Sequence, residues 1–434
     1  MKKVAILTDF KSVDYGYSLT HVVQNQIKML TRAGYEVLVT VVGDFKPAEA
    51  FAHPQVKLFQ LPVVQITNNM SAVEDKNFQT DIQTIYEAYK EALKDIDVVL
   101  THDLVYQPGA VKHQIAARRL AAERQDLKWL HWIHSATSPM TITMERRFYE
   151  GEYKRLLIEQ FPNSYYIFFN DWSKRRIATN FGVPVSRVKT VYHPTDILGW
   201  FGMHEFSKQL IEKHNLLSPD LLAVYPVRLD SGKNAEVVLE IMITLRNKGY
   251  ETKTVIADFH STSSDPNDPK FQVRQKMKDM AKRWKYEDNL IFTSEFIPET
   301  RGVVPPQMIR DLMLISNIFV MASRSESYSL ITQEAALTKN LILLNDDFPP
   351  FREIFGDHNF FIKVGSNVNV QTQLDGETET QYRPNQDQYM EDKALEIITE
   401  FNRNPVLKTN QKIRKERNLD YVWKNQLEPL IESS

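Results

Sequence analysis

Apolar runs alternate with amphipathic stretches along the chain, beginning with Val4–Phe10 (VAILTDF). A polar loop follows this run, and a helical pattern then extends to Met29. Residues 32–42 come next, in which Gly34 suits the left-handed position after a helix and an apolar run follows it. A strand, a helix and a second strand in this order predict a βαβ unit with two parallel strands.

The same pattern returns in the second half of the chain. The apolar run of residues 221–230 (LLAVYPVRLD) leads through a polar loop to a helical pattern that ends near Leu245. Gly249 again suits the position after the helix, and an apolar run extends to residue 258. A second βαβ unit is therefore predicted.

Other runs of strand length continue both halves. In the first half they cover residues 96–103, 127–135, 165–171 and 188–194, and in the second half residues 289–296, 317–323, 340–346 and 360–364. Runs that are apolar on both faces are typical of parallel strands covered by helices on each side. We therefore predict an α/β protein of two Rossmann-like domains.

The strand pattern lapses between Thr195 and Pro219, so the domain boundary is expected there. The prediction is an N-terminal domain of residues 1–205 and a C-terminal domain of residues 206–418. Residues 419–434 have a helical pattern and are expected to complete the N-terminal domain.

Composition restricts the kinds of partner, metal site and cellular location that the chain can have. The 434 residues are 42% hydrophobic and 25% charged, with a formal net charge of −2, which demands no polyanionic partner. The absence of cysteine excludes disulfides and thiolate metal sites. No apolar stretch reaches the roughly 18 residues of a membrane span, and the first run is too short for a signal peptide. A cytoplasmic protein is expected, with peripheral membrane contact left open.

Two cations, Arg228 and Lys233, lie in the loop between the first strand and first helix of the second half. Arginine forms forked hydrogen bonds to phosphate oxygens, and lysine acts as a compact charge. Beside a helix N-terminus, the pair could neutralise a diphosphate. A solvated basic loop is the other interpretation, and the two are about equally favoured by this loop alone.

A second loop, after the run of residues 317–323, carries Glu326 and, eight positions later, Glu334. A helix is expected to start near Ser329 or Leu330, where free backbone N–H groups would meet an anion. A carboxylate accepts hydrogen bonds from adjacent hydroxyls of a ribose or a hexose. Taken singly, each glutamate is more simply a helix-start charge or an exposed acid.

Together these loops resemble those of the GT-B fold glycosyltransferases, and within them the retaining family 4 (glycosyl transferases group 1). The resemblance rests on the Arg-x4-Lys loop at Arg228 and Lys233, the Glu-x7-Glu element at Glu326 and Glu334, and their separation. It covers residues 221–365 well and the first half loosely. It implies two parallel sheets facing a central cleft, with an acceptor domain followed by a nucleotide-sugar donor domain.

The resemblance also implies roles for single residues. Arg228 and Lys233 would bind the diphosphate and stabilise the departing nucleotide, while Glu326 would hold the transferred sugar. Backbone N–H groups of Ser329 and Leu330 would meet the distal phosphate. Glu334 would accept hydrogen bonds from the ribose hydroxyls. Phe296 would lie near the base of the nucleotide. A UDP- or GDP-sugar is the expected donor.

The chain departs from the family at several points. The family usually has Glu-Gly-Phe-Gly after the first glutamate, whereas this chain has Ser327, Tyr328 and Ser329 after Glu326. Loss of both glycines restricts the backbone angles over the phosphate. Paired glycines after the first strand are reduced to Gly16.

In the first half, His131 and His134 lie at the end of a strand candidate. They point to opposite faces because their spacing is three. His134 is the favoured catalytic histidine, since in the family a histidine at this strand end faces the reacting centre. It could orient the acceptor hydroxyl or donate to the sugar, and a structural core histidine is the alternative. Gly16 and its loop are expected to border the acceptor.

Chemistry on this site is expected to proceed with retention and without a metal or other cofactor. Arg228, Lys233 and the helix start could stabilise the leaving phosphate. No metal-ligand spacing such as His-Glu-x-x-His occurs, and Asp95-Ile-Asp97 lies at the wrong end of its strand. Neither half has Gly-x-Gly-x-x-Gly after its first strand, which argues against a dinucleotide oxidoreductase.

Two alternatives remain open. Basic-aromatic runs at Arg118-Arg119, residues 146–149 and residues 172–176 fit a phage-type enzyme of the same fold that glycosylates DNA bases. These runs are more simply solvated helix faces, and DNA is not the favoured acceptor. A non-catalytic nucleotide-sugar-binding protein is the second alternative, and the four intact donor-side residues argue against it.

Overall fold

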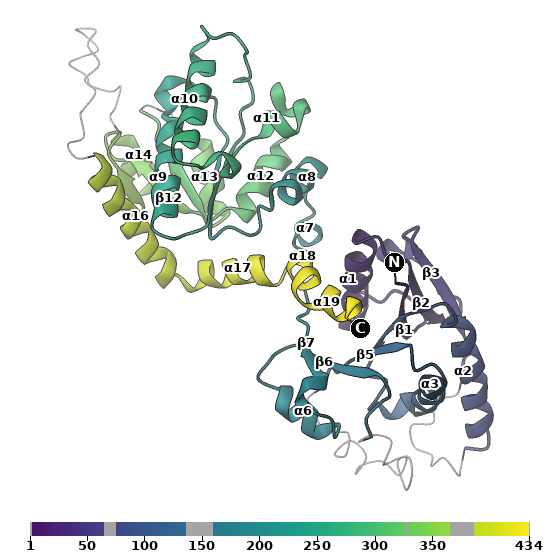
Figure 1. Cartoon of the computed structure of the whole chain (residues 1–434). Coiled ribbons are helices and arrows are strands. Elements are labelled where there is room, and N and C mark those ends of the chain that lie inside the picture. Colours follow the sequence, from purple (N-terminus) through teal and green to yellow (C-terminus); the bar gives the residue numbers. More distant parts are fainter. Residues whose placement is uncertain are drawn as a thin grey trace, which may run out of the picture. The chain divides into compact units, whose positions relative to one another are not determined.

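The computed structural model describes residues 2–64, 75–135, 159–324, 326, 328–364 and 386–433. The chain folds into two compact units (Figure 1). Unit 1 contains Met1–Asp196 together with Arg417–Ser434, and unit 2 contains Ile197–Glu416. The sequence-based boundary was placed between residues 205 and 206.

Unit 1 is built on a parallel sheet in the order β3-β2-β1-β4-β5-β6-β7. Its strands are β1 (Val4–Phe10), β2 (Val37–Val42), β3 (Val56–Leu61), β4 (Val98–His102), β5 (Lys128–Trp132), β6 (Ser164–Phe168) and β7 (Val188–Thr190). Its helices are α1 (Ser18–Arg32), α2 (Phe78–Ala92), α3 (Val111–Glu123), α6 (Lys174–Asn180), α18 (Leu419–Val422) and α19 (Glu428–Glu432), with short turns η1 (Glu49–Ala52), η2 (Pro108–Ala110), η3 (Val185–Arg187) and the π-helical η7 (Trp423–Leu427).

Unit 2 repeats this plan with the order β10-β9-β8-β11-β12-β13, again parallel. Its strands are β8 (Leu221–Tyr225), β9 (Thr252–Ile256), β10 (Leu290–Phe292), β11 (Ile318–Met321), β12 (Leu341–Asn345) and β13 (Phe360–Ile362). Its helices are α7 (Ile197–Trp200), α8 (Glu205–His214), α9 (Ala235–Asn247), α10 (Pro269–Arg283), α11 (Thr293–Phe296), α12 (Pro306–Ile315), α13 (Leu330–Leu337), α14 (Pro350–Phe355), α16 (Gln386–Arg403) and α17 (Pro405–Glu416), with turns η4 (Ser231–Lys233), η5 (Glu287–Asn289) and η6 (Pro298–Arg301).

Both faces of each sheet are buried by helices. In unit 1, Ala5 and Leu7 of β1 belong to one apolar core, whereas Val4 and Ile6 belong to another on the opposite face. Alternate residues of β8 divide in the same way. The predicted fold class, α/β with two parallel sheets covered by helices, is confirmed.

The strand orders place a topological switch point in each unit. In unit 1 the chain builds outward from β1 through β2 and β3, and then resumes on the other side of β1 with β4. In unit 2 the corresponding neighbours are β8 and β11. Ligands of open parallel sheets bind beyond the carboxyl ends of the strands at this point.

The last residues of the chain pack onto unit 1. Trp423, Leu427 and Ile431 are buried in the core that also contains residues of α1, and α18 contacts α1 (Figure 1). The segment joins unit 1 beside the point where the chain leaves it, because the amide of Thr195 donates to the carbonyl of Arg417 at 2.6 Å. Residues 195 and 418 also form a parallel bridge.

Two elements differ from the sequence prediction. Strand β3 was not predicted, because most of its side chains are partly or fully exposed and it has no continuous apolar run. The expected strand over residues 289–296 ends at Phe292, and α11 begins at Thr293. The Asp258 carboxylate accepts a hydrogen bond from the amide of Ser294 at 3.0 Å, which stabilises this helix start. Within the described ranges, every helix is too short or too polar to cross a bilayer.

Candidate functional site

Two loops meet at the switch point of unit 2. One follows β8 and carries Arg228 and Lys233, and the other follows β11 and carries Glu326. The amide of Arg324 donates to the carbonyl of Gly232 at 2.9 Å. The side-chain amide of Asn234 donates to the carbonyl of Ala322 at 2.8 Å. The two loops therefore form one structure, although about 90 residues separate them along the chain.

Lys233 and Glu326 are joined by an ion pair between the ammonium group and Oε1. Both side chains are largely buried, with 22% and 17% of their surfaces exposed. The hydroxyl of Ser323 donates to the same carboxylate oxygen at 2.8 Å. The hydroxyl of Tyr225, at the end of β8, donates to the carbonyl of Lys233 at 2.5 Å and so holds the loop against the strand. The cation and the acid are thus held together at the sheet edge.

Arg228 occupies the exposed rim of the same loop. Its side chain is 56% exposed, and its Nε lies 3.5 Å from a carboxylate oxygen of Asp230. Exposed ion pairs of this kind contribute about 0–1 kcal/mol to stability, so the guanidinium can turn to another anion at little cost.

The start of α13 has an unusual backbone. Ser329 has φ 67 and ψ 71, in the left-handed region, and its side chain does not cap the helix. Its hydroxyl instead bonds the hydroxyl of Thr332 at 2.8 Å. Ser329 stands where the resembled family has a glycine, and the backbone keeps the conformation that glycine favours. In the first turn of α13 the amide of Thr332 donates to the carbonyl of Ser329 at 3.2 Å, whereas the amide of Leu330 has no hydrogen-bond acceptor among the described residues and can meet an anion.

Glu334 is exposed on α13 and lines a cavity of about 610 Å³. Most of the wall is apolar and comes from the ends of β8 and β9, the segment before α12, and α12 and α13. The lining residues besides Glu334 are Pro226, Phe259, His260, Val303, Val304, Pro306, Ile309, Arg310, Met313, Ile331, Leu337 and Thr338. The cavity extends to Pro226, two residues before Arg228.

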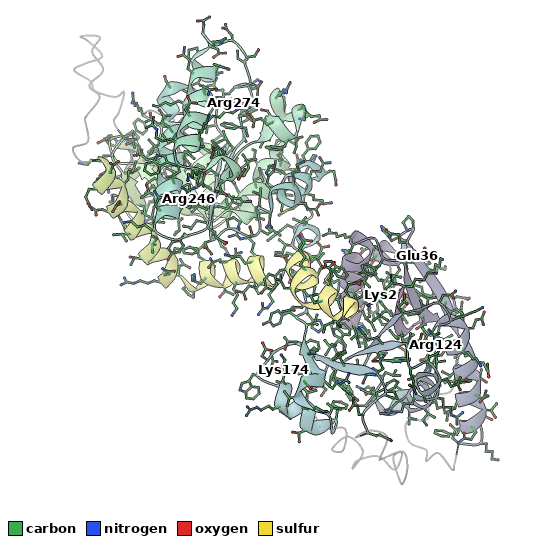
Figure 2. The ribbon with its side chains drawn as sticks, viewed as in Figure 1. Lys2, Glu36, Arg124, Lys174, Arg246 and Arg274 are labelled. Atoms are coloured by element: carbon green, nitrogen blue, oxygen red, sulfur yellow. The ribbon has the colours of Figure 1, made fainter. Side chains whose placement is uncertain are left out.

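Sequence reasoning missed the residues opposite Glu334. Phe259 and His260 are held by Asp258, which is fully buried and pairs with Arg274 of α10 at 2.8 Å (Arg274 is labelled in Figure 2). His260 has a left-handed backbone, and its amide donates to the carbonyl of Arg301 at 3.1 Å. These contacts join loop residues to distant parts of the chain, so the periodic pattern did not predict them. The Ala257-Asp258-Phe259 stretch directly after β9 was the available clue.

Phe296 does not line this cavity. Its ring lies on the ring of His214 in α8, with centroids 4.0 Å apart, and 43% of the residue is exposed. The formation of α11 turns the side chain in this direction. The structure therefore pairs Lys233 with Glu326, leaves Arg228 exposed on the same loop, places Glu334 on the wall of the cavity and leaves Phe296 elsewhere.

In unit 1, the two predicted histidines have different surroundings. His131 is fully buried in β5, where its Nδ1 bonds the hydroxyl of Thr101 at 2.8 Å. Burial lowers the pKa of His131 to about 3, so the ring is a neutral core group at pH 7. His134 lies beyond the end of β5, and its backbone amide donates to Asp103 at 3.0 Å.

His134 belongs to a chain of hydrogen bonds that sequence reasoning did not predict. Its Nε2 lies 2.9 Å from Nδ1 of His102, and Nε2 of His102 lies 3.0 Å from the side-chain carbonyl of Gln26. His193 stacks on His134 with centroids 5.5 Å apart. Burial is the main cause that lowers the pKa of His102 and His134, and it lowers that of His193 to about 4.

The tautomers of this chain are linked to one another. When the Gln26 oxygen accepts from Nε2–H of a neutral His102, Nδ1 of His102 accepts from Nε2–H of His134. The remaining ring nitrogen of His134, Nδ1, then carries a lone pair. A neutral His134 can therefore accept a hydrogen bond from a hydroxyl through Nδ1.

The loop that contains Gly16 begins at the end of β1. The amide of Gly16 donates to the carboxylate of Asp14 at 2.8 Å. Asp9 near the end of β1, together with Lys11 and Tyr17 of this loop, lines a second cavity at the carboxyl ends of the unit 1 strands.

The basic-aromatic runs are partly structural. Arg118 lies over the ring of Phe161 and donates to the carbonyls of Glu159 and Gln160. Lys174 pairs with Asp171 at 2.5 Å, whereas Trp172 is 87% exposed. Residues 146–149 lie outside the described residues. In the described parts of the chain, no group of three or more His, Asp or Glu side chains could hold a metal ion.

Part of the chain matches a known protein family. Residues 206–375 match the family described as glycosyl transferases group 1, and this range contains Arg228, Lys233, Glu326 and Glu334. No curated protein matches the chain. The matched region is a glycosyltransferase domain, and the chain is therefore a glycosyltransferase.

Several solved structures are similar at low identity. A glycosyltransferase from Rickettsia africae has 12% identity, a TM-score of 0.35 and coverage of 100% of both chains. Anabaena HepE in complex with UDP-glucose has 13% identity, a TM-score of 0.31 and coverage of 99% of each. A UDP-forming α,α-trehalose-phosphate synthase from Burkholderia xenovorans has 11% identity, a TM-score of 0.36 and coverage of 100% of this chain and 99% of that one. TM-scores this low establish no closer relationship.

Proposed function

We propose that the chain transfers a sugar from a nucleotide-diphosphate sugar to a hydroxyl acceptor, with retention of anomeric configuration and without a metal. One observation carries most of the proposal. The loops after β8 and β11 are bonded together at the switch point, and they place Lys233 against Glu326 beside the start of α13.

The donor would lie along this surface. The nucleoside would enter the cavity of about 610 Å³, with its ribose hydroxyls on Glu334 and its base against the apolar wall that includes Val303, which is 68% exposed. The diphosphate would meet Arg228, Lys233 and the first N–H groups of α13. Glu326, already beside Lys233, would accept hydrogen bonds from the sugar.

The charge arrangement supports departure of the nucleotide diphosphate, and the transfer that we propose proceeds with retention. The bond between the anomeric carbon and the phosphate oxygen breaks, and the acceptor oxygen bonds to the same face of that carbon. The acceptor proton passes to the leaving phosphate oxygen. Arg228, Lys233 and the helix start stabilise the negative charge that develops there, which is the contribution a metal ion would otherwise make. His134, through the lone pair on Nδ1, could orient the acceptor hydroxyl rather than donate to the sugar.

A thermal-shift screen of UDP-, GDP- and ADP-sugars tests the donor assignment. One nucleotide sugar is expected to raise the melting temperature of the protein, because a ligand that binds only the folded state stabilises it. The shift should shrink in Lys233→Ala and Glu334→Ala. Equal shifts in the wild type and both variants would remove the assignment.

The product of the reaction tests the mechanism. Its anomeric configuration, measured by NMR, should match that of the donor. Rates with EDTA and with added Mg²⁺ should agree. Inversion would refute the retaining mechanism, and activity lost in EDTA and restored by Mg²⁺ would refute metal independence.

A further inference from the structure

One edge of unit 1 carries an excess of positive charge. Residues 164–192, which form β6, α6, η3 and β7, contain five basic side chains and one acidic side chain, whereas the whole chain has a formal net charge of −2. Strand β7 is the last strand of the sheet, and α6 contacts it (Figure 1). The positive charge is therefore concentrated at one edge of the sheet.

The single acid of this segment is already neutralised. Asp171 pairs with Lys174 at 2.5 Å and accepts a hydrogen bond from the hydroxyl of Thr190 at 2.7 Å (Lys174 is labelled in Figure 2). The other four cations have no acidic partner in the part of the chain that the structure describes; they are Arg175, Arg176, Arg187 and Lys189. Four positive charges at this edge are therefore available to an anionic partner.

An exposed tryptophan accompanies two of these cations. Trp172 is 87% exposed, the largest fraction of any large apolar side chain in the described residues. Ser173, which joins Trp172 to α6, has a helical backbone. Arg175 and Arg176 follow Trp172 by three and four positions, a spacing that places the three side chains on one side of a helix, and all three are exposed. The outer side of α6 thus presents an indole beside two guanidinium groups.

The other two cations lie on the neighbouring part of this edge. Arg187 of η3 and Lys189 of β7 lie over the ring of Tyr165 in β6, 5.2 and 5.3 Å from its centroid, which holds both charges at the sheet edge. Val185 of η3 is 48% exposed, and α6 contacts both η3 and β7. We call this surface the basic edge, and it consists of Trp172, Arg175, Arg176, Val185, Arg187 and Lys189.

The composition of the basic edge indicates a lipid surface. Tryptophan prefers the headgroup level of a bilayer, and lysine and arginine are attracted to anionic lipid headgroups. A nucleic acid would also attract the cations, but an exposed aliphatic side chain such as Val185 gains little from a phosphate backbone. The same side chain can enter the boundary between headgroups and acyl chains. Charge combined with an apolar contact is typical of proteins that lie on a membrane surface.

We propose that the basic edge of unit 1 binds the surface of an anionic membrane, with Trp172 at the headgroup level and the four cations against lipid phosphates. The contact is peripheral, because side chains reach the headgroups and no element enters the hydrocarbon core. This inference does not depend on the proposed glycosyl transfer, so it is tested without donor or acceptor.

Sedimentation with vesicles tests the proposal. The full chain is mixed with vesicles of phosphatidylcholine alone, or of phosphatidylcholine with phosphatidylglycerol. It is expected to bind the anionic vesicles at least tenfold more strongly than the neutral ones, and added salt should release it because salt screens the charges. Equal binding to both kinds of vesicle, or binding to neither, would overturn the proposal.

Charge reversal locates the surface. The double variant Arg175→Glu with Arg176→Glu should weaken binding to the anionic vesicles at least tenfold. Lys282→Glu with Arg283→Glu, at two exposed cations in the last turn of α10, changes the net charge equally and is the matched control. The control should bind within about twofold of the wild type. Equal losses in the two double variants would show a general effect of net charge and overturn the assigned surface.

Replacement of Trp172 tests the apolar contact. Lipids with brominated acyl chains quench the fluorescence of a tryptophan that reaches them. Trp172→Ala should remove most of this quenching and weaken vesicle binding. Trp200→Ala, at the 80% exposed tryptophan of α7, is the matched control and should leave the quenching unchanged. Quenching that persists in Trp172→Ala would exclude the indole as the membrane contact.

Duplex DNA tests the competing class of polyanion. A gel shift at the same salt concentration as the vesicle experiment is expected to show no complex that depends on the basic edge. A DNA complex that is lost in the double arginine variant would assign the basic edge to nucleic acid and overturn the proposal.

Discussion

At the scale of single residues, the site depends on a few side chains that are held by partners rather than exposed to water. Lys233 and Glu326 neutralise each other while both remain largely buried. An anionic donor that approaches Lys233 therefore meets a cation already oriented by a carboxylate. Glu334, in contrast, is exposed beside an apolar cavity, where a ribose would give its carboxylate two hydrogen bonds.

Removal of either Lys233 or Glu334 is expected to weaken donor binding. Lys233→Ala removes a phosphate contact and leaves the Glu326 charge unpaired, and Glu334→Ala removes the ribose contact. Each should raise the Kd of the nucleotide sugar at least tenfold, about 1.4 kcal/mol, in a calorimetric titration. Glu287→Ala, at an exposed glutamate of η5, is the control. Unchanged affinity in both site variants would contradict the donor assignment.

Buried histidines of unit 1 predict a loss of stability in mild acid. The pKa of His193 and of His113 is lowered to about 4, and that of His131 to about 3, against roughly 6.5 in an unfolded chain. The unfolded state therefore binds more protons, and the free energy of unfolding falls as the pH drops below about 6.5.

At pH 5 each of these three histidines should lower the free energy of unfolding by about 1–2 kcal/mol relative to its value at pH 7. Urea unfolding followed by tryptophan fluorescence, to which the buried Trp129 and Trp132 of unit 1 contribute, measures the effect. His193→Gln should flatten the pH dependence, whereas replacement of the exposed His53 should not. Equal urea midpoints at pH 5 and pH 7 would exclude this account.

At the scale of elements, the two loops of unit 2 act as one because Asn234 links them. Its backbone is left-handed (φ 49, ψ 45) at the start of α9, and its side chain bonds the carbonyl of Ala322. Asparagine tolerates this conformation better than most residues, and glycine tolerates it freely. Backbone strain and the side-chain bond can therefore be separated by two substitutions.

Asn234→Gly should lower the free energy of unfolding by about 1–3 kcal/mol, because it removes the bond to a buried carbonyl. Asn234→Ala should cost about 1 kcal/mol more, because alanine strains the left-handed backbone. This order is the reverse of that found inside helices, and chemical denaturation of both variants checks it. Greater stability of Asn234→Ala would show that the backbone relaxes.

The periodic elements could be predicted from the sequence, and the cavity walls could not. Apolar runs located β1, β4, β8 and β11, and hence the loops where Arg228 and Glu326 lie. The positions of Phe259 and His260 depend on the buried Asp258–Arg274 pair, which no pattern reveals. Phe296 was expected at the end of a strand over residues 289–296, whereas helix α11 begins at Thr293 and turns its side chain toward His214.

At the scale of the whole molecule, the chain passes from unit 1 to unit 2 and then returns. The returning segment contributes Trp423 to the core of unit 1, where its ring lies against Tyr35 with centroids 5.5 Å apart. The stability of unit 1 thus depends on residues made after unit 2 is complete.

Trp423→Ala should destabilise unit 1 by about 3–5 kcal/mol, because it opens a cavity in a packed core. The donor-dependent increase in melting temperature, which reports on unit 2, should remain. Differential scanning calorimetry with and without the nucleotide sugar separates the two transitions. Loss of both together would show that the units unfold cooperatively.

Unit 2 is inserted into unit 1 between Thr195 and Arg417, two residues that are hydrogen-bonded to each other. Departure and return of the backbone occur at neighbouring residues, so a short synthetic linker from residue 196 to residue 417 would close unit 1 without stretching the chain. A different nucleotide-binding module could be spliced between the same two positions. If unit 2 binds the donor, as proposed, this exchange would change the donor while unit 1 stayed the same.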